Sequence, residues 1–145
     1  MDGIYIPSFN RAKKNFNLEK KKILIIGGCG YIGSRLYDVL SGEFHVDTVD
    51  LEWYGNHTAS ENKKIDFGNL NPQEIEKYTH IVLLAGHSSV KMCEDDMVST
   101  IRNNVLNFAK ILDSISRKQV LIYASSSSVY GDTESSLVDE EYSQF

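Results

Sequence analysis

The chain has 145 residues, of which 41% are apolar and 24% are charged, as is ordinary for a globular protein. This length allows one domain with one hydrophobic core and is short for a two-domain enzyme. The formal net charge of −5 argues against a nucleic-acid-binding protein. Two cysteines are too few for a disulfide framework, which fits a reducing compartment, and no apolar run reaches membrane-spanning length.

Residues 1–20 form a basic leader without the apolar core of a secretion signal, so we expect a cytoplasmic protein. Such a leader can touch an anionic partner, or it can be a solvated segment ahead of the first strand. The composition favours the solvated segment.

The next segment predicts a strand, a glycine turn and a helix. Residues 21–26 are mostly apolar and β-branched, and residues 27–33 read Gly-Gly-Cys-Gly-Tyr-Ile-Gly. Apolar side chains then recur at helical spacing, at Ile32, Leu36, Val39 and Leu40. A glycine pattern in this context predicts a dinucleotide site.

Each glycine has a physical role in such a site. Gly27 allows a sharp turn, Gly30 lets a pyrophosphate approach the main chain, and Gly33 lets the helix pack close to the strand. The free N–H groups at the helix start then hold the phosphates. The alternative is a tight packing turn without a ligand.

The remaining chain alternates strands and helices. The pattern predicts a short helix opened by a capping box at Asn71, Pro72 and Glu74, and one long helix over 98–115. Further strands are predicted at 44–50, 64–67, 81–85 and 120–124. This alternation predicts an α/β fold over residues 21–145, a Rossmann-like doubly wound parallel sheet with strand order 3-2-1-4-5.

Aspartates end two of the predicted strands, at the sheet edge where ligands bind in such folds. Asp50 lies some twenty residues after the glycine turn, where a carboxylate accepts both adenosine ribose hydroxyls and repels a 2′-phosphate. This favours NAD over NADP, although a solvated strand-end aspartate is the alternative. Asp66 is placed to hydrogen-bond the adenine edge or to cap the following turn.

Two loops follow the later strands. Small residues at 84–90 allow the backbone to lie along a cofactor. His87 in this loop is placed either to contact the nicotinamide ribose or a substrate, or to be a loop histidine without chemistry, and the sequence favours the second. Four serines at 125–128 form a polar loop, or they hydrogen-bond a reacting carbonyl or alcohol. No metal site is predicted, because none of the four histidines has a companion at metal-ligand spacing.

Together these segments resemble the extended short-chain dehydrogenases/reductases, most closely the NAD-dependent sugar-nucleotide epimerases and dehydratases of the UDP-glucose 4-epimerase type. The segments that carry the resemblance follow the family's order, at 27–36, Asp50, Asp66, 84–90, 103–105 and 125–131. The resemblance implies NAD as cofactor, a nucleotide sugar as substrate, and hydride transfer between the two.

The resemblance also implies roles for individual residues. Ser126 matches the catalytic hydroxyl that hydrogen-bonds the oxygen whose carbon gives up hydride. Asn104 matches a helix asparagine near the cofactor, with Asn103 as the alternative. The implied cofactor-binding residues are Gly27, Gly30, Tyr31, Ile32, Gly33, Asp50, Asp66, Phe67, Leu84, Ala85, Gly86, Asn104 and Ser125.

One family feature is absent from these 145 residues. The family's general base is a tyrosine in Tyr-x-x-x-Lys, and no such motif occurs in this sequence. The last strands and the sugar-binding domain are also missing, so the chain resembles the cofactor half of an enzyme.

We expect the 145 residues alone to have no epimerase, dehydratase or dehydrogenase turnover. General acid–base catalysis contributes about 10²–10⁴-fold to rates, and both the base and the sugar domain are missing. Incubation with UDP-, dTDP- and GDP-sugars, followed by product chromatography, checks this. Robust turnover would show that another residue acts as the base.

Two alternatives to an epimerase or dehydratase portion stay open. One is a related reductase or dehydrogenase of another carbonyl substrate. The other is a non-catalytic dinucleotide-binding module. The incomplete fold predicts association in either case, as a homodimer or with a carboxyl-terminal half.

Overall fold

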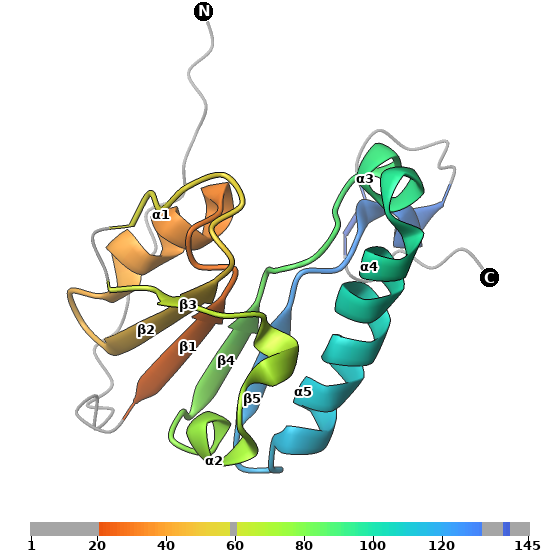
Figure 1. Ribbon diagram of the computed structural model, residues 1–145. Helices are drawn as coiled ribbons and strands as arrows, with labels where there is room; N and C mark the ends of the chain where they lie inside the picture. Colours follow the sequence, from red (N-terminus) through yellow and green to blue (C-terminus); the bar gives the residue numbers. More distant parts are fainter. Residues whose placement is uncertain (1–20, 59–60, 132–137, 140–145) are drawn as a thin grey trace, which may run out of the picture.

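The computed structural model describes residues 21–58, 61–131 and 138–139, so the basic leader lies outside the described residues. Five parallel strands form one sheet in the order β3-β2-β1-β4-β5, which confirms the predicted topology (Figure 1). The strands are β1 (Lys22–Ile26), β2 (His45–Asp50), β3 (Lys63–Lys64), β4 (His80–Leu83) and β5 (Val120–Tyr123).

The central strand β1 is buried on both faces because its side chains alternate between two apolar clusters. Leu24 and Ile26 pack on the face that Ile111 covers, and Ile23 and Ile25 pack on the face that Leu36 covers. Parallel strands between helix layers require such continuous apolar runs. Because these strands are parallel, the carboxyl ends of β1, β2 and β4 lie at the same edge of the sheet.

Helices flank both faces of the sheet (Figure 1). Helix α1 (Tyr31–Leu40) covers one face, and α5 (Phe108–Ser114) packs on the other. Helix α4 (Met97–Ile101) precedes α5 in the chain. The short α2 (Pro72–Ile75) carries the predicted capping box, in which Asn71 Oδ1 accepts from the Gln73 N–H at 3.0 Å. Among the described residues no helix is long and apolar enough to cross a membrane.

The predicted long helix over 98–115 is interrupted. A π-helical segment, Arg102–Asn107, separates α4 from α5, and α3 (Val90–Asp95) precedes them without having been predicted. Asn103 and Asn107 of this π-helical segment are buried. A pattern of apolar residues cannot predict the burial of asparagines. Such segments are frequent at functional sites.

The third strand is also shorter than predicted. It ends at Lys64, because Asp66 accepts a hydrogen bond from the Gly68 N–H at 2.9 Å and begins a 3₁₀ turn over Phe67–Asn69. The predicted strand over 64–67 is therefore wrong from residue 65 onward.

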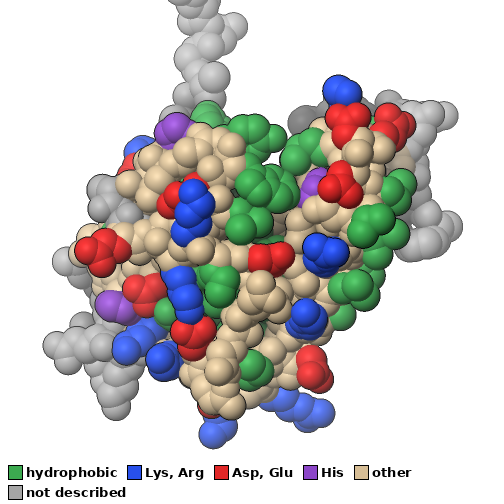
Figure 2. Space-filling model, viewed as in Figure 1, with side chains coloured by type: hydrophobic (Ala, Val, Ile, Leu, Met, Phe, Trp, Pro, Cys, Tyr) green, Lys and Arg blue, Asp and Glu red, His purple; other side chains and the backbone are tan. Residues whose placement is uncertain are grey.

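Strand β5 is an edge strand of the described sheet, with β4 as its neighbour. Its Val120 and Ile122 are 46% and 52% exposed. Figure 2 shows further hydrophobic side chains gathered over α4 and α5, and the exposed apolar residues there include Val98, Ile101, Val105 and Leu112. Unpaired edges and apolar patches of this kind promote association.

We therefore expect the chain to be marginally stable and to self-associate through β5 and the α4–α5 surface. Light scattering over a concentration series should show a mass that grows with concentration, and the outer amides of β5 should exchange rapidly in the monomer. A stable monomer with strongly protected β5 amides would contradict this prediction.

Candidate functional site

The glycine turn lies between the ends of β2 and β4. The Gly27 N–H donates to the Val49 carbonyl at 2.7 Å, and Gly27 has a φ of 93°, in the left-handed region. A Cβ at Gly27 would lie 2.6 Å from the Ala85 nitrogen, and one at Gly33 would overlap the Gly27 carbonyl oxygen. The turn is therefore packed backbone against backbone on both sides.

The turn leads into the amino terminus of α1. Gly30 is its N-cap and makes no side-chain capping hydrogen bond, and the first turn carries no acidic residue. Helix starts with free N–H groups attract anions such as phosphates. Tyr31 and Ile32 begin the helix and are 94% and 62% exposed.

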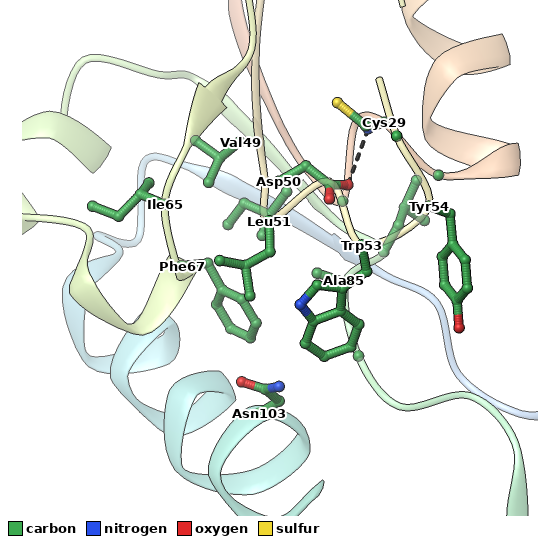
Figure 3. A pocket seen from close by; sticks show the side chains of 16 residues that line it. Cys29, Val49, Asp50, Leu51, Trp53, Tyr54, Ile65, Phe67, Ala85 and Asn103 are labelled. Atoms are coloured by element: carbon green, nitrogen blue, oxygen red, sulfur yellow. Dashed lines mark hydrogen bonds between the residues drawn. The ribbon is translucent and has the colours of Figure 1, made fainter. Parts of the chain in front are cut away.

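Asp50 ties the end of β2 to the glycine turn. Its Oδ2 accepts from the Cys29 N–H at 3.0 Å (Figure 3). Its Oδ1 accepts from the Glu52 N–H at 2.7 Å. Each carboxylate oxygen has a second lone pair, so these bonds leave acceptor capacity for a ligand hydroxyl.

A cavity of about 150 Å³ opens at this edge of the sheet. Figure 3 shows aromatic side chains and Asn103 surrounding it beside the Asp50 carboxylate. The predicted site residues that line it are Gly27, Gly30, Asp50, Phe67, Leu84, Ala85 and Gly86. The structure thus brings together residues from the ends of three strands.

Other predicted site residues lie outside the cavity lining. Asp66 caps the 3₁₀ turn, which is the second role considered from the sequence, and its Oδ1 also accepts from Asn107 Nδ2 at 2.9 Å. Ser125 lies in the loop after β5. Ser126 accepts from the Ser128 N–H at 3.1 Å and starts a 3₁₀ turn over Ser127–Tyr130.

The two neighbouring asparagines of the π-helical segment have different positions. Asn104 grips the backbone of the loop after β4, because its Oδ1 accepts from the His87 N–H and its Nδ2 donates to the His87 carbonyl, both at 2.9 Å. Asn103 lines the cavity. Asn103, the alternative to Asn104 in the sequence analysis, is thus the asparagine that lines the cavity. Asn104 instead hydrogen-bonds the loop after β4.

Sequence reasoning missed the aromatic wall of the cavity. Trp53 and Tyr54 follow Asp50 in the loop after β2, and the Trp53 ring meets the His87 ring edge-on at 5.3 Å between centroids. The two rings join the loops after β2 and β4. The available signal was an aromatic pair three and four residues after a strand-ending aspartate, in a loop where such side chains have no core position to fill.

Cys29 is enclosed within the turn and is only 2% exposed. Burial, together with the nearby Asp50 and Glu52 carboxylates, raises the pKa of its thiol to about 11. Thiolate is the reactive form, so we expect native Cys29 to be alkylated by iodoacetamide at least about tenfold more slowly than Cys93 near neutral pH. Peptide mass spectrometry reads both sites in one sample. Equal rates would show that the turn opens readily.

The chain is similar to known proteins in both sequence and fold. The family model of the NAD dependent epimerase/dehydratase family matches residues 23–145. UDP-glucuronic acid decarboxylase 1 of Xenopus tropicalis is 32% identical over 133 residues, covering 86% of this chain and 31% of that protein. Protein CapI of Staphylococcus aureus is 30% identical, covering 76% of this chain and 39% of its own length. The chain thus spans about a third of the length of the curated relatives it matches.

Solved structures share the fold. A UDP-N-acetylglucosamine 4-epimerase from Methanobrevibacter ruminantium M1 superposes with a TM-score of 0.73 at 23% identity, over 85% of this chain and 43% of that one. A UDP-glucose 4-epimerase from Brucella ovis, solved in complex with NAD, gives 0.68 at 24% identity, over 86% and 42%.

Proposed function

Because this chain belongs to the NAD dependent epimerase/dehydratase family, we propose that its described residues bind NAD in the cavity at the carboxyl edge of the sheet. The observation that carries the proposal is the meeting of the glycine turn and Asp50 in one cavity. The turn has no room for a Cβ at Gly27 or Gly33, and the α1 amino terminus beside it is uncapped by side chains. These features suit a pyrophosphate and its neighbouring ribose.

Different residues contact different parts of the cofactor. The N–H groups at the start of α1 hold the pyrophosphate, and Asp50 accepts from the adenosine ribose hydroxyls. Phe67, buried at the end of the β3 loop, forms an apolar wall for the adenine. Ala85 and Gly86 let the backbone after β4 approach the rest of the cofactor.

We further propose that the chain is the cofactor-binding portion of an enzyme acting on a nucleotide sugar. The support comes from its relatives, which include a UDP-glucuronic acid decarboxylase and UDP-sugar epimerases. Bound NAD supplies the acceptor for a hydride from the sugar. Ser126, at the start of the 3₁₀ turn after β5, donates a hydrogen bond to the sugar oxygen at the reacting carbon.

Isothermal titration calorimetry of the 145-residue chain with NAD and NADP tests the cofactor proposal. We expect saturable one-site binding of NAD and weaker binding of NADP, since the Asp50 carboxylate repels a 2′-phosphate. No heat with NAD, at a protein concentration where circular dichroism shows the folded chain, would contradict the proposal.

A further inference from the structure

A line of polar side chains runs beside the cavity, from Asp66 to His87. Asn107 Nδ2 donates to Asp66 Oδ1 at 2.9 Å and to Asn103 Oδ1 at 3.1 Å. Asn103 Nδ2 in turn lies 3.5 Å from His87 Nδ1. Asn103 and Asn107 are only 6% and 2% exposed, and buried amides of this kind depend on such partners.

The carboxylate of Asp66 determines which side-chain atoms along this line donate hydrogen bonds and which accept them. Its Oδ1 accepts from the Gly68 N–H at 2.9 Å as well as from Asn107, and an ionised carboxylate only accepts. Asn107 must therefore turn its Nδ2 toward Asp66. In that orientation Asn107 Nδ2 also donates to Asn103, so the acceptor on Asn103 must be its Oδ1 and not its Nδ2.

The orientation of the Asn103 amide determines which role His87 Nδ1 has in their contact. With Oδ1 of Asn103 committed to Asn107, its Nδ2 faces His87 as a donor, so His87 Nδ1 is the acceptor. In a neutral imidazole the proton is then on Nε2. The Asp66 carboxylate is thus connected to the His87 imidazole through Asn107 and Asn103.

We propose that Asp66, Asn107 and Asn103 are positioning residues that hold His87 as its Nε2–H tautomer, so that it donates a hydrogen bond to an oxygen of the bound dinucleotide. The ligand half of this inference rests on the proposed function. The placement of His87 supports it, because Asn104 clamps its backbone and Trp53, which lines the cavity, meets its ring at 5.3 Å. Figure 3 shows Asn103 extending from its helix toward the cavity below Trp53.

The tautomer half is tested without any ligand. In protein labelled with ¹⁵N-histidine, at about pH 8.5, well above the usual histidine pKa of about 6.5, the imidazole nitrogen shifts of His87 should report a proton on Nε2. Asn103→Asp keeps the side-chain shape but can only accept, so His87 should switch to a proton on Nδ1. The other three histidines, His45, His57 and His80, serve as internal controls and should not change.

Two results would overturn the tautomer assignment. One is a proton on Nδ1 of His87 in the unmodified chain. The other is an Nε2–H tautomer that persists in a folded Asn103→Asp protein. Asn107→Leu gives a second variant, in which we expect the shifts to move toward a mixture of tautomers because Asn103 is no longer oriented.

The ligand half is tested by calorimetry with NAD. Losing one neutral hydrogen bond costs about 0.5–1.5 kcal/mol, so His87→Leu should weaken NAD binding about 2- to 12-fold, and His87→Gln, which keeps an N–H donor, should recover part of the loss. Equal affinity of His87→Leu and the unmodified chain would overturn the donor role while leaving the proposed function intact. No NAD binding by the unmodified chain would overturn both, and the tautomer result would stand by itself.

Discussion

Replacing Gly33 by alanine is expected to abolish measurable NAD binding. The new Cβ would overlap the Gly27 carbonyl oxygen and also lie 2.9 Å from the Gly28 Cα. Both neighbours are backbone atoms, so no side-chain rotation relieves the overlap, and α1 must move away from β1. Overpacking of this kind costs about 3 kcal/mol, which corresponds to roughly a 100-fold loss of affinity if binding requires the original turn.

Gly42→Ala is the matched control for this substitution. Nothing lies within 4 Å of the position where its Cβ would stand, so its free energy of unfolding should stay within about 0.5 kcal/mol of the unmodified chain. Urea unfolding and NAD calorimetry on both variants give the comparison. If Gly33→Ala binds NAD as Gly42→Ala does, the close packing of the turn is not what positions the phosphates.

Asp50→Ala is expected to weaken NAD binding about tenfold or more and to narrow the preference for NAD over NADP. A hydrogen bond to a charged group contributes about 1.5–3 kcal/mol, and the like charge that opposes the 2′-phosphate disappears with it. The substitution also removes the acceptor for the Cys29 and Glu52 N–H groups, so the free energy of unfolding should fall by about 1–2 kcal/mol. Calorimetry with both cofactors, beside urea unfolding, separates the two effects.

Asp96→Ala controls for the loss of a capping carboxylate away from the site. Asp96 Oδ1 accepts from the Ser99 N–H at 2.9 Å at the start of α4. This variant should lose a similar amount of stability and keep the cofactor preference. If Asp50→Ala leaves the ratio of NAD affinity to NADP affinity unchanged, Asp50 does not bind the ribose hydroxyls.

The fold was predictable because its signals are local and repeated. Apolar runs such as 23–26, a glycine turn before an amphipathic helix, and the capping box at Asn71 each identify an element from a few neighbouring residues. The order of the strands then follows from the right-handed connections of parallel sheets. The errors arose where a side chain overrode the pattern, as when Asp66 capped a turn and ended β3 at Lys64.

Only part of the candidate site was predictable from the sequence. Glycines and a strand-ending aspartate carry a recognisable spacing, and the structure places Gly27, Gly30 and Asp50 at one cavity. The side of the cavity made by Trp53 and Asn103 depends on long-range packing and on a π-helical segment. Neither leaves a periodic signal in the sequence, so the sequence could not predict that His87 lies beside Trp53 and Asn103.

Amide NMR during a titration with NAD tests the central claim most directly. We expect the largest shift changes at the glycine turn and the start of α1, over residues 27–33, with further changes at the loops that carry Trp53 and Gly86. ADP-ribose should reproduce the changes at residues 27–33, since it carries the same pyrophosphate and adenosine. Saturable changes elsewhere on the chain, with residues 27–33 unaffected, would contradict the assignment of this cavity as the NAD site.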